Sequence, residues 1–113
     1  MIKAIIISGD QATTDDAIRL TKSCCPDIII EATARDIKNG VLIINTHQPD
    51  IIILDTFIQD GSGFELLNHF EKPDFKVLFI SEYVEYAIKA IEYNAIAYLL
   101  KPLAEQKFTT SIN

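Results

Sequence analysis

The chain has 113 residues, 49% of them hydrophobic, and carries a formal net charge of −6 with an isoelectric point of ≈ 4.7. This length and apolar content predict one packed domain and argue against a disordered chain. The acidic balance argues against nucleic-acid binding through a basic face. The apolar runs are shorter than a membrane span requires, and the first residues do not have the layout of a signal peptide. We therefore expect a cytoplasmic protein in which the adjacent Cys24 and Cys25 are reduced thiols.

Apolar runs and helical spacings alternate along the chain. Short runs rich in Ile, Leu, Val or Phe predict buried strands, and apolar residues at intervals of three and four predict helices between them. In chain order, the expected elements are a strand at 4–7, a helix at 12–24, a strand at 28–30, a helix at 36–47, a strand at 51–55, a helix around Phe64, Leu67 and Phe70, a strand at 76–80, a helix around Val84, Ala87, Ile88 and Ile91, a strand at 96–100 and a short helix from 104.

This alternation predicts an α/β fold with a doubly wound, five-stranded parallel sheet and helices on both faces. The flavodoxin-like strand order 2-1-3-4-5 suits a chain of this size and places the first and third strands side by side. We expect a single domain over residues 1–113. Ligands of such sheets bind beyond the carboxyl ends of the strands, so the loops at that edge are the place to look for function.

Four strand ends deliver polar side chains to that edge. Asp55 closes the third strand, Ser81 and Lys101 follow the fourth and fifth, and Asp10 lies just beyond the first. A carboxylate can act as a nucleophile and form an acyl phosphate, while a lysine and a hydroxyl can stabilise the phosphoryl oxygens. The set therefore suits phosphoryl transfer to Asp55. Plainer roles also fit these residue types: helix capping for Asp55 and Ser81, and a solvated surface position for Lys101.

These features resemble the receiver domains of bacterial two-component response regulators, which have a CheY-like fold. Residues 86–95, together with residues 98–102, are similar to receivers of the LytR/AlgR group, which usually precede a LytTR-type DNA-binding domain. The residues that carry the resemblance are the apolar strand ending in Asp55, the segment 63–67, Ser81, the segment 86–95, and Tyr98 three residues before Lys101 and Pro102.

The resemblance implies a role for each matching residue. Asp55 would be the phosphoacceptor, with a histidine kinase as its partner, and Lys101 would pair with the phosphoryl group ahead of a cis bond to Pro102. Ser81 would be the switch hydroxyl and Tyr98 the switch aromatic, which moves inward on activation. Beyond phosphorylation and dephosphorylation at Asp55, no enzyme activity is implied.

The resemblance also implies a partner surface and an output. The surface is built from the fourth helix, the fifth strand and the last helix, and it can support a homodimer. Tyr83, Tyr86 and Tyr93 crowd this region, where aromatic rings with polar tips favour interfaces, although they can equally cover their own helix. We expect a regulator of transcription that contacts DNA only through an output domain outside this chain.

The acidic pocket departs from the family pattern. Receivers usually have two aspartates and a further acid where this chain has Ser8, Gly9 and Asp10, and the second aspartate is the usual direct Mg²⁺ ligand. The remaining candidate ligands are Asp10, Asp55 and the backbone carbonyl of Phe57. Since glycine cannot replace a carboxylate, we expect Mg²⁺ binding and phosphorylation to be weak or absent.

Two functions from different classes follow. The first is a phosphorylation-controlled signalling switch, favoured by Asp55, Ser81 and Lys101. The second is a phosphorylation-independent interaction module that keeps the receiver fold, favoured by Ser8, by Gly9 and by the negative charge of Glu82 next to the switch hydroxyl. A small flavodoxin-like cofactor domain fits less well, because the first loop lacks a phosphate cradle rich in glycine and hydroxyl residues.

Overall fold

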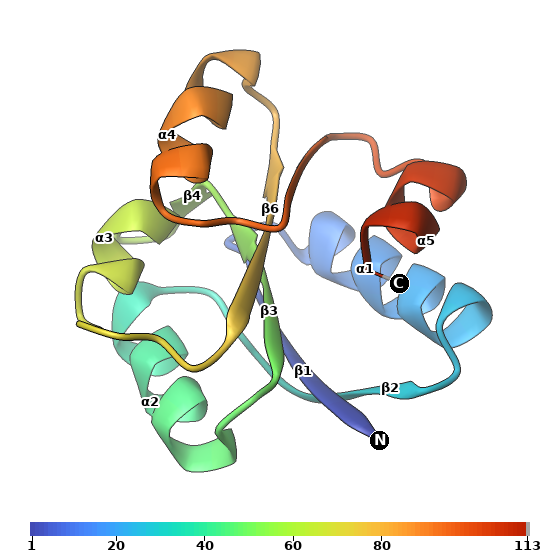
Figure 1. Cartoon of the computed structure of the whole chain (residues 1–113), viewed down its shortest axis with the longest axis horizontal. Coiled ribbons are helices and arrows are strands. Elements are labelled where there is room, and N and C mark those ends of the chain that lie inside the picture. Colours follow the sequence, from blue (N-terminus) through green and yellow to red (C-terminus); the bar gives the residue numbers. More distant parts are fainter. Residues whose placement is uncertain (113) are drawn as a thin grey trace.

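Parallel strands form a central sheet with helices on both faces (Figure 1). The computed structural model describes residues 1–112. The strands of the sheet are β1 (Ile2–Ile7), β2 (Ile28–Ala34), β3 (Ile51–Asp55), β6 (Lys76–Ser81) and β7 (Ala97–Leu100). They run parallel in the order β2-β1-β3-β6-β7, which confirms the predicted 2-1-3-4-5 topology. β1 and β3 are therefore neighbours, and their carboxyl ends meet.

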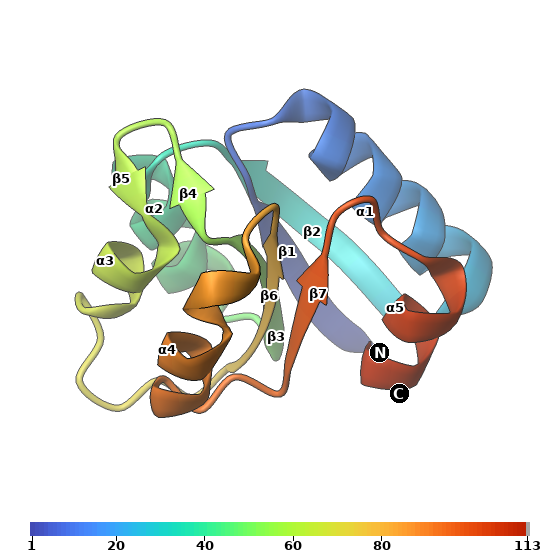
Figure 2. The same cartoon turned by 90° about the horizontal axis from the view of Figure 1, so that it is seen from above.

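The helices divide between the two faces of the sheet. They are α1 (Gln11–Cys24), α2 (Ile37–His47), α3 (Gly63–Leu67), α4 (Ala87–Glu92), which follows the short 3-10 helix η1 (Val84–Tyr86), and α5 (Glu105–Ile112). Viewed from above, α1 and α5 cover one face, and α2, α3 and α4 cover the other (Figure 2). Within residues 1–112, no helix is long and apolar enough to cross a membrane.

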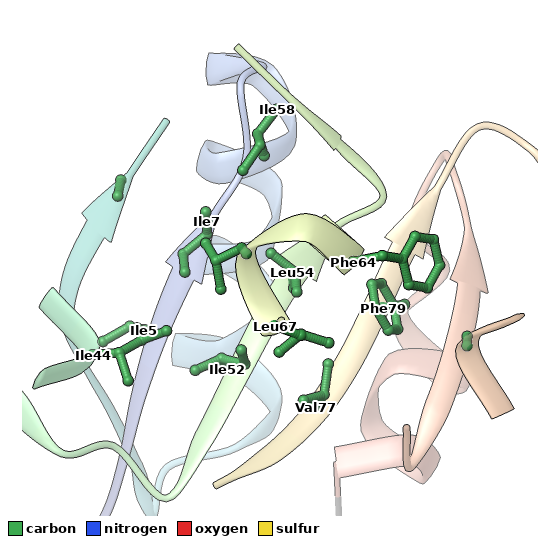
Figure 3. Close-up of a cluster of buried hydrophobic side chains, with 13 residues drawn as sticks. Ile5, Ile7, Ile44, Ile52, Leu54, Ile58, Phe64, Leu67, Val77 and Phe79 are labelled. Atoms are coloured by element: carbon green, nitrogen blue, oxygen red, sulfur yellow. The ribbon is translucent and has the colours of Figure 1, made fainter. Parts of the chain in front are cut away.

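Alternate residues of the central strands feed two separate cores, because successive side chains of a strand point to opposite faces. On the side of α2, α3 and α4, the core includes Ile52, Leu54 and Phe79. Figure 3 shows Phe64 of α3 beside Phe79, with ring centroids 4.8 Å apart. On the side of α1 and α5, the core includes Ile53 and Phe108. A strand buried on both faces explains the unbroken apolar run before Asp55.

The structure differs from the expected elements in several places. β1 begins at Ile2 and not at residue 4, and β2 continues to Ala34, beyond the expected end at Ile30. The helix around Phe64 ends at Leu67, before the predicted Phe70, and single 3-10-type bonds such as Phe70 N–H to the Leu67 carbonyl at 3.0 Å continue the turn. A hairpin of β4 (Phe57–Ile58) and β5 (Gly61–Ser62), which the sequence pattern did not indicate, follows β3. Three apolar residues that mark the fourth helix lie at the surface, where Val84, Ile88 and Ile91 are 68%, 73% and 71% exposed.

Two smaller expectations are met. Cys24 and Cys25 are both free thiols, and Cys25 is buried. The Lys101–Pro102 peptide bond is cis.

Candidate functional site

The carboxylate of Asp55 lies at the carboxyl end of β3 and is almost completely buried, with 4% of the residue exposed. One of its oxygens, Oδ2, accepts a hydrogen bond from the Ser8 hydroxyl at 2.9 Å and is paired with the Lys101 ammonium at 2.7 Å. Ser8 follows β1 and Lys101 follows β7, so three strand ends meet at this oxygen. The sequence predicted the proximity of Asp55 and Lys101 but not the bond from Ser8.

Lys101 is held in place by the sheet. Its backbone N–H donates to the Ser81 carbonyl at 2.8 Å, which extends the β6–β7 pairing by one residue. The side chain is only 14% exposed, and its ammonium faces two further carboxylates, Glu82 at 3.8 Å and Asp10 at 4.0 Å. Lys101 is therefore the cation at the centre of an acidic pocket.

Asp10 caps the first helix. Its Oδ1 accepts from the Ala12 N–H at 3.1 Å, and its Oδ2 accepts from the Thr13 hydroxyl at 2.7 Å. The hydrogen bond from Thr13 holds the pKa of Asp10 below its ordinary value of 3.8. The carboxylate is thus committed to the N-terminus of α1 and reaches Asp55 only through the ammonium of Lys101.

Ser81 is fully buried at the end of β6 and does not contact the Asp55 carboxylate. Its hydroxyl lies 2.7 Å from the hydroxyl of Thr56, which is also fully buried, and accepts from the Tyr83 N–H at 3.0 Å. Thr56 was missed by the sequence reasoning, although a hydroxyl directly after the strand-terminal aspartate is a visible signal. The buried Ser81 hydroxyl is therefore already hydrogen-bonded in the resting pocket.

Tyr98 of β7 is linked to the same loop. Its hydroxyl donates to the backbone carbonyl of Tyr83, whose N–H is the group bound by Ser81. Its ring lies against Phe79, with centroids 6.3 Å apart. Burial raises the pKa of the Tyr98 phenol above its ordinary value of 10.0. The backbone of Tyr83 therefore connects the expected switch hydroxyl, Ser81, to the expected switch aromatic, Tyr98.

An open pocket of about 250 Å³ gives access to this centre. Gly9, Asp55 and Lys101 line its floor, and Phe57 and Tyr83 line its rim. The Phe57 ring makes edge-to-face contacts with Tyr83 and Tyr86 at centroid distances of 5.7 and 5.2 Å. These three rings contact one another and form an aromatic wall beside the pocket.

Other tyrosines pack over the molecule itself. The rings of Tyr86 and Tyr93 lie against Phe64, at centroid distances of 6.4 and 5.1 Å, and the Tyr93 hydroxyl donates to Asn68 at 2.9 Å. Tyr83, by contrast, is 44% exposed. Of the tyrosines near the fourth helix, Tyr86 and Tyr93 cover their own domain, and Tyr83 is the one presented to solvent.

The residues present do not fit the Mg²⁺ site of a typical receiver. Mg²⁺ needs several oxygen ligands in near-octahedral geometry. Gly9 offers no side chain, Asp10 is committed to its cap, and Oδ2 of Asp55 is already paired with Lys101. Among residues 1–112, no three Asp, Glu, His or Cys side chains lie close enough to hold a metal ion. The backbone carbonyl of Phe57 and Oδ1 of Asp55 alone are a poor donor set.

The arrangement suits chemistry on a phosphoryl group nonetheless. Oδ1 of Asp55 receives only a long contact, 3.5 Å from the Phe57 N–H, and the Asp55 carboxylate borders the open pocket. A carboxylate with one lightly engaged oxygen can attack phosphorus, and the adjacent ammonium can balance charge on the phosphoryl oxygens. A buried aspartate paired with a lysine from another strand end of the same doubly wound sheet is the arrangement of a signalling domain of the receiver type.

Comparison with known proteins agrees with this class. Residues 5–113 match the response regulator receiver domain model, so the chain belongs to the receiver-domain family of two-component response regulators. The sensory transduction protein LytT of Enterococcus faecalis is 32% identical over 111 residues, covering 96% of this chain and 46% of the relative. LytT of Oceanobacillus iheyensis is 30% identical over 116 residues, with the same coverage. The chain spans about half the length of these curated relatives, and their names agree with the expected likeness to the LytR/AlgR group.

Solved structures confirm the fold. A LuxR-family DNA-binding response regulator from Staphylococcus aureus superposes with a TM-score of 0.88 at 23% identity, covering 100% of this chain and 97% of the other. The response regulatory domain of mrkE from Klebsiella pneumoniae gives 0.87 at 23% identity, covering 98% and 92%. Receivers of this family interact with histidine kinases and are not enzymes apart from phosphoryl chemistry at their own aspartate, which agrees with the expectations from the sequence.

Proposed function

We propose that Asp55 accepts a phosphoryl group from a histidine kinase and that the domain then switches a partner surface. The observation that supports this most is the 2.7 Å pair between Asp55 and Lys101 beside an open pocket. In the proposed transfer, a carboxylate oxygen attacks phosphorus, the P–N bond of the phosphohistidine breaks, and the imidazole nitrogen takes the electron pair. Lys101 stays beside the new acyl phosphate and balances its charge.

The switch proposed here passes through the hydroxyl of Ser81. A phosphoryl oxygen on Asp55 is a stronger acceptor than Thr56, so it attracts the Ser81 hydroxyl out of its 2.7 Å contact. Ser81 then releases the N–H of Tyr83, and the loop that holds the Tyr98 hydroxyl is free to rearrange. The phosphoryl group thereby selects one of two loop arrangements, as in other population shifts.

The partner surface proposed is the face of α4, β7 and α5, used by a second copy of the chain. Its support is the apolar exposure of this region: Val84, Ile88 and Ile91 are about 70% exposed, and Leu100 of β7 is 47% exposed. An apolar group of this kind, close to the switch, marks an interaction site more often than a free surface. The proposal includes a transcriptional, DNA-binding output domain outside this chain and a cytoplasmic location, where the kinase partner acts.

The test is a backbone amide NMR spectrum of the wild-type domain before and after incubation with phosphoramidate, a small phosphodonor. Phosphorylation is expected to shift the amides of Asp55, Ser81, Tyr83 and Tyr98 together. The shifts should be absent in Asp55→Ala, while Asp74→Ala, a change at an exposed position in the loop before β6, should respond like the wild type. Unchanged spectra in the wild-type protein would contradict phosphoryl acceptance.

A second candidate function is a phosphorylation-independent interaction module. It is supported by the two donors that already occupy Oδ2 of Asp55 and by the absence of a side chain at Gly9. In that case, the α4 surface binds its partner in the resting state. Unchanged spectra with phosphoramidate, combined with concentration-dependent association, would favour this function over the first.

A further inference from the structure

Position 9 lies against the hairpin that the sequence did not predict. A Cβ atom added at Gly9 would lie 3.3 Å from the backbone nitrogen of Gln59, 3.4 Å from its Cγ and 3.5 Å from the carbonyl carbon of Ile58. The hairpin is tied down on its far side, because the Gln59 N–H donates to the Arg35 carbonyl at 2.9 Å. Asp60 also accepts from the N–H of Ile37 at 2.7 Å. The space that a carboxylate at position 9 needs is thus narrow.

Position 8 carries a neutral donor in place of an acid. The Ser8 hydroxyl is completely buried, donates to Asp55 and accepts from the Asp10 N–H at 3.2 Å. An aspartate at this position would put a second carboxylate against Asp55 and would require a cation between them. Ser8 removes that requirement, since a hydroxyl stabilises the Asp55 charge without adding one of its own.

The positive charge of the pocket comes from the chain. Lys101 places its ammonium 2.7, 3.8 and 4.0 Å from the carboxylates of Asp55, Glu82 and Asp10. At these distances the attraction to each carboxylate is substantial, most of all for the buried Asp55. The three acids are therefore arranged around a lysine, as acids elsewhere are arranged around a divalent ion.

We propose that the pocket of this receiver is complete without Mg²⁺, because Ser8 stands where other receivers have an acid and, with Lys101, already satisfies the Asp55 carboxylate. Asp55 is held by one neutral donor and one resident cation. This inference concerns the resting pocket and does not depend on whether Asp55 is phosphorylated.

A titration of Mg²⁺ against the amide NMR spectrum of the whole domain tests the proposal, with NaCl at matched ionic strength as the salt control. In the wild-type protein, we expect the amides of residues 8–10, 55–57 and 101 to respond equally to both salts. The double variant Ser8→Asp with Gly9→Asp, which restores both acids, should show saturable shifts at these amides with MgCl₂ alone. Gly9→Ala adds the Cβ without a carboxylate and should behave like the wild type.

Two results would overturn the proposal. Saturable, Mg²⁺-specific shifts in the wild-type protein that disappear in Asp55→Ala would show that the pocket has a working metal site. A folded double variant that still ignores Mg²⁺ would show that positions 8 and 9 are not what decides metal binding. If the double variant does not fold, the single variant Gly9→Asp provides the same comparison.

Discussion

At the scale of single residues, the pocket is governed by the cost of burying a carboxylate. A buried charge is tolerated only when donors or opposite charges surround it. Asp55 receives both, one from Ser8 and one from Lys101, on the same oxygen. If one partner is removed, the other alone must stabilise the buried charge of Asp55.

The variant Ser8→Ala is expected to lower the free energy of unfolding by about 2 kcal/mol, the range for losing a hydrogen bond to a charged group. Urea denaturation followed by circular dichroism measures the change. Ser23→Ala, at an exposed position near the end of α1, is the matched control and should change little, because its hydroxyl makes only long contacts, 3.4 Å to the Leu20 carbonyl and 3.4 Å to the Cys24 sulfur. Equal effects of the two substitutions would show that the Ser8 bond contributes nothing.

The partly buried phenol of Tyr98 gives a prediction in alkaline solution. Its pKa is raised in the folded protein, so the neutral phenol contributes stability below the unfolded pKa of about 10, and this contribution is lost as pH rises through the higher folded value. Ultraviolet absorbance of tyrosinate should show a step at high pH that is missing in Tyr98→Phe. Titration curves that differ in amplitude but share one midpoint, with both proteins still folded, would contradict the raised pKa of Tyr98.

The candidate residues themselves could be predicted from the sequence, but their contacts could not. Asp55, Ser81 and Lys101 follow apolar runs, and the topology of a doubly wound sheet brings strand ends to one edge. The bonds of Ser8 to Asp55 and of Thr56 to Ser81 depend on side-chain rotamers and on loops packed from elsewhere in the chain. The spacing of residues along the sequence does not predict these side-chain contacts.

At the scale of elements, the segment after β3 is shaped by close backbone contacts. Ser62 and Glu65 form a capping box that starts α3, with the Ser62 hydroxyl accepting from the Glu65 N–H at 3.1 Å. Gly63 sits directly under the strand end, where an added Cβ would lie 2.5 Å from the carbonyl oxygen of Asp55 and 2.8 Å from Cγ of Leu54. This glycine lets α3 begin against the backbone of the functional residue.

Gly63→Ala is therefore expected to destabilise the domain by about 2 kcal/mol, because a backbone atom must move to relieve the overlap. Gly61→Ala is a graded control. Its Cβ would meet the ends of two flexible side chains, Ile37 Cδ1 at 2.9 Å and Glu65 Oε2 at 3.0 Å, and the loss should be smaller. Guanidinium denaturation of both variants measures the difference, and a Gly63→Ala variant as stable as the wild type would refute the close contact.

Element boundaries show which signals the sequence carries. The strand ending in Asp55 and the helix capped by Asp36 were predicted within a residue, since apolar runs and capping groups are local. The β4–β5 hairpin has only two residues in each strand, too few for a period to be visible, and its pairing rests on contacts with Arg35 and Ile37. Sequence patterns do not predict such short elements, because residues distant in the sequence hold them in place.

At the scale of the whole molecule, the exposed face of α4 is the feature that the single domain leaves unpartnered. Apolar spacing correctly marked a helix at Val84, Ile88 and Ile91, yet these side chains point to solvent while Ala90 is the residue buried against the sheet. Periodicity identifies an apolar face, but it does not say whether the face covers its own sheet or another molecule. That distinction required the three-dimensional arrangement.

The variant Ile88→Lys separates association from stability. Ile88 is 73% exposed, so the substitution should change the free energy of unfolding of the monomer by no more than about 0.5 kcal/mol. If the proposed homodimer uses this face, the charge should weaken self-association, measured by sedimentation velocity over a range of concentrations. Leu42→Lys, at a position of α2 that is 59% exposed, is the control. Equal sedimentation of wild type and Ile88→Lys at all concentrations would exclude this surface.

The distribution of tyrosines has an optical consequence. The chain has four tyrosines and no tryptophan, and all four lie between residues 83 and 98, in η1, α4 and β7 or next to them. Its intrinsic fluorescence therefore originates entirely from the side of the molecule that contains Ser81, the aromatic wall of the pocket and the exposed α4 face. Emission from the unmodified protein reports rearrangements there and nowhere else, so a rearrangement of this side can be followed in real time without attaching a dye.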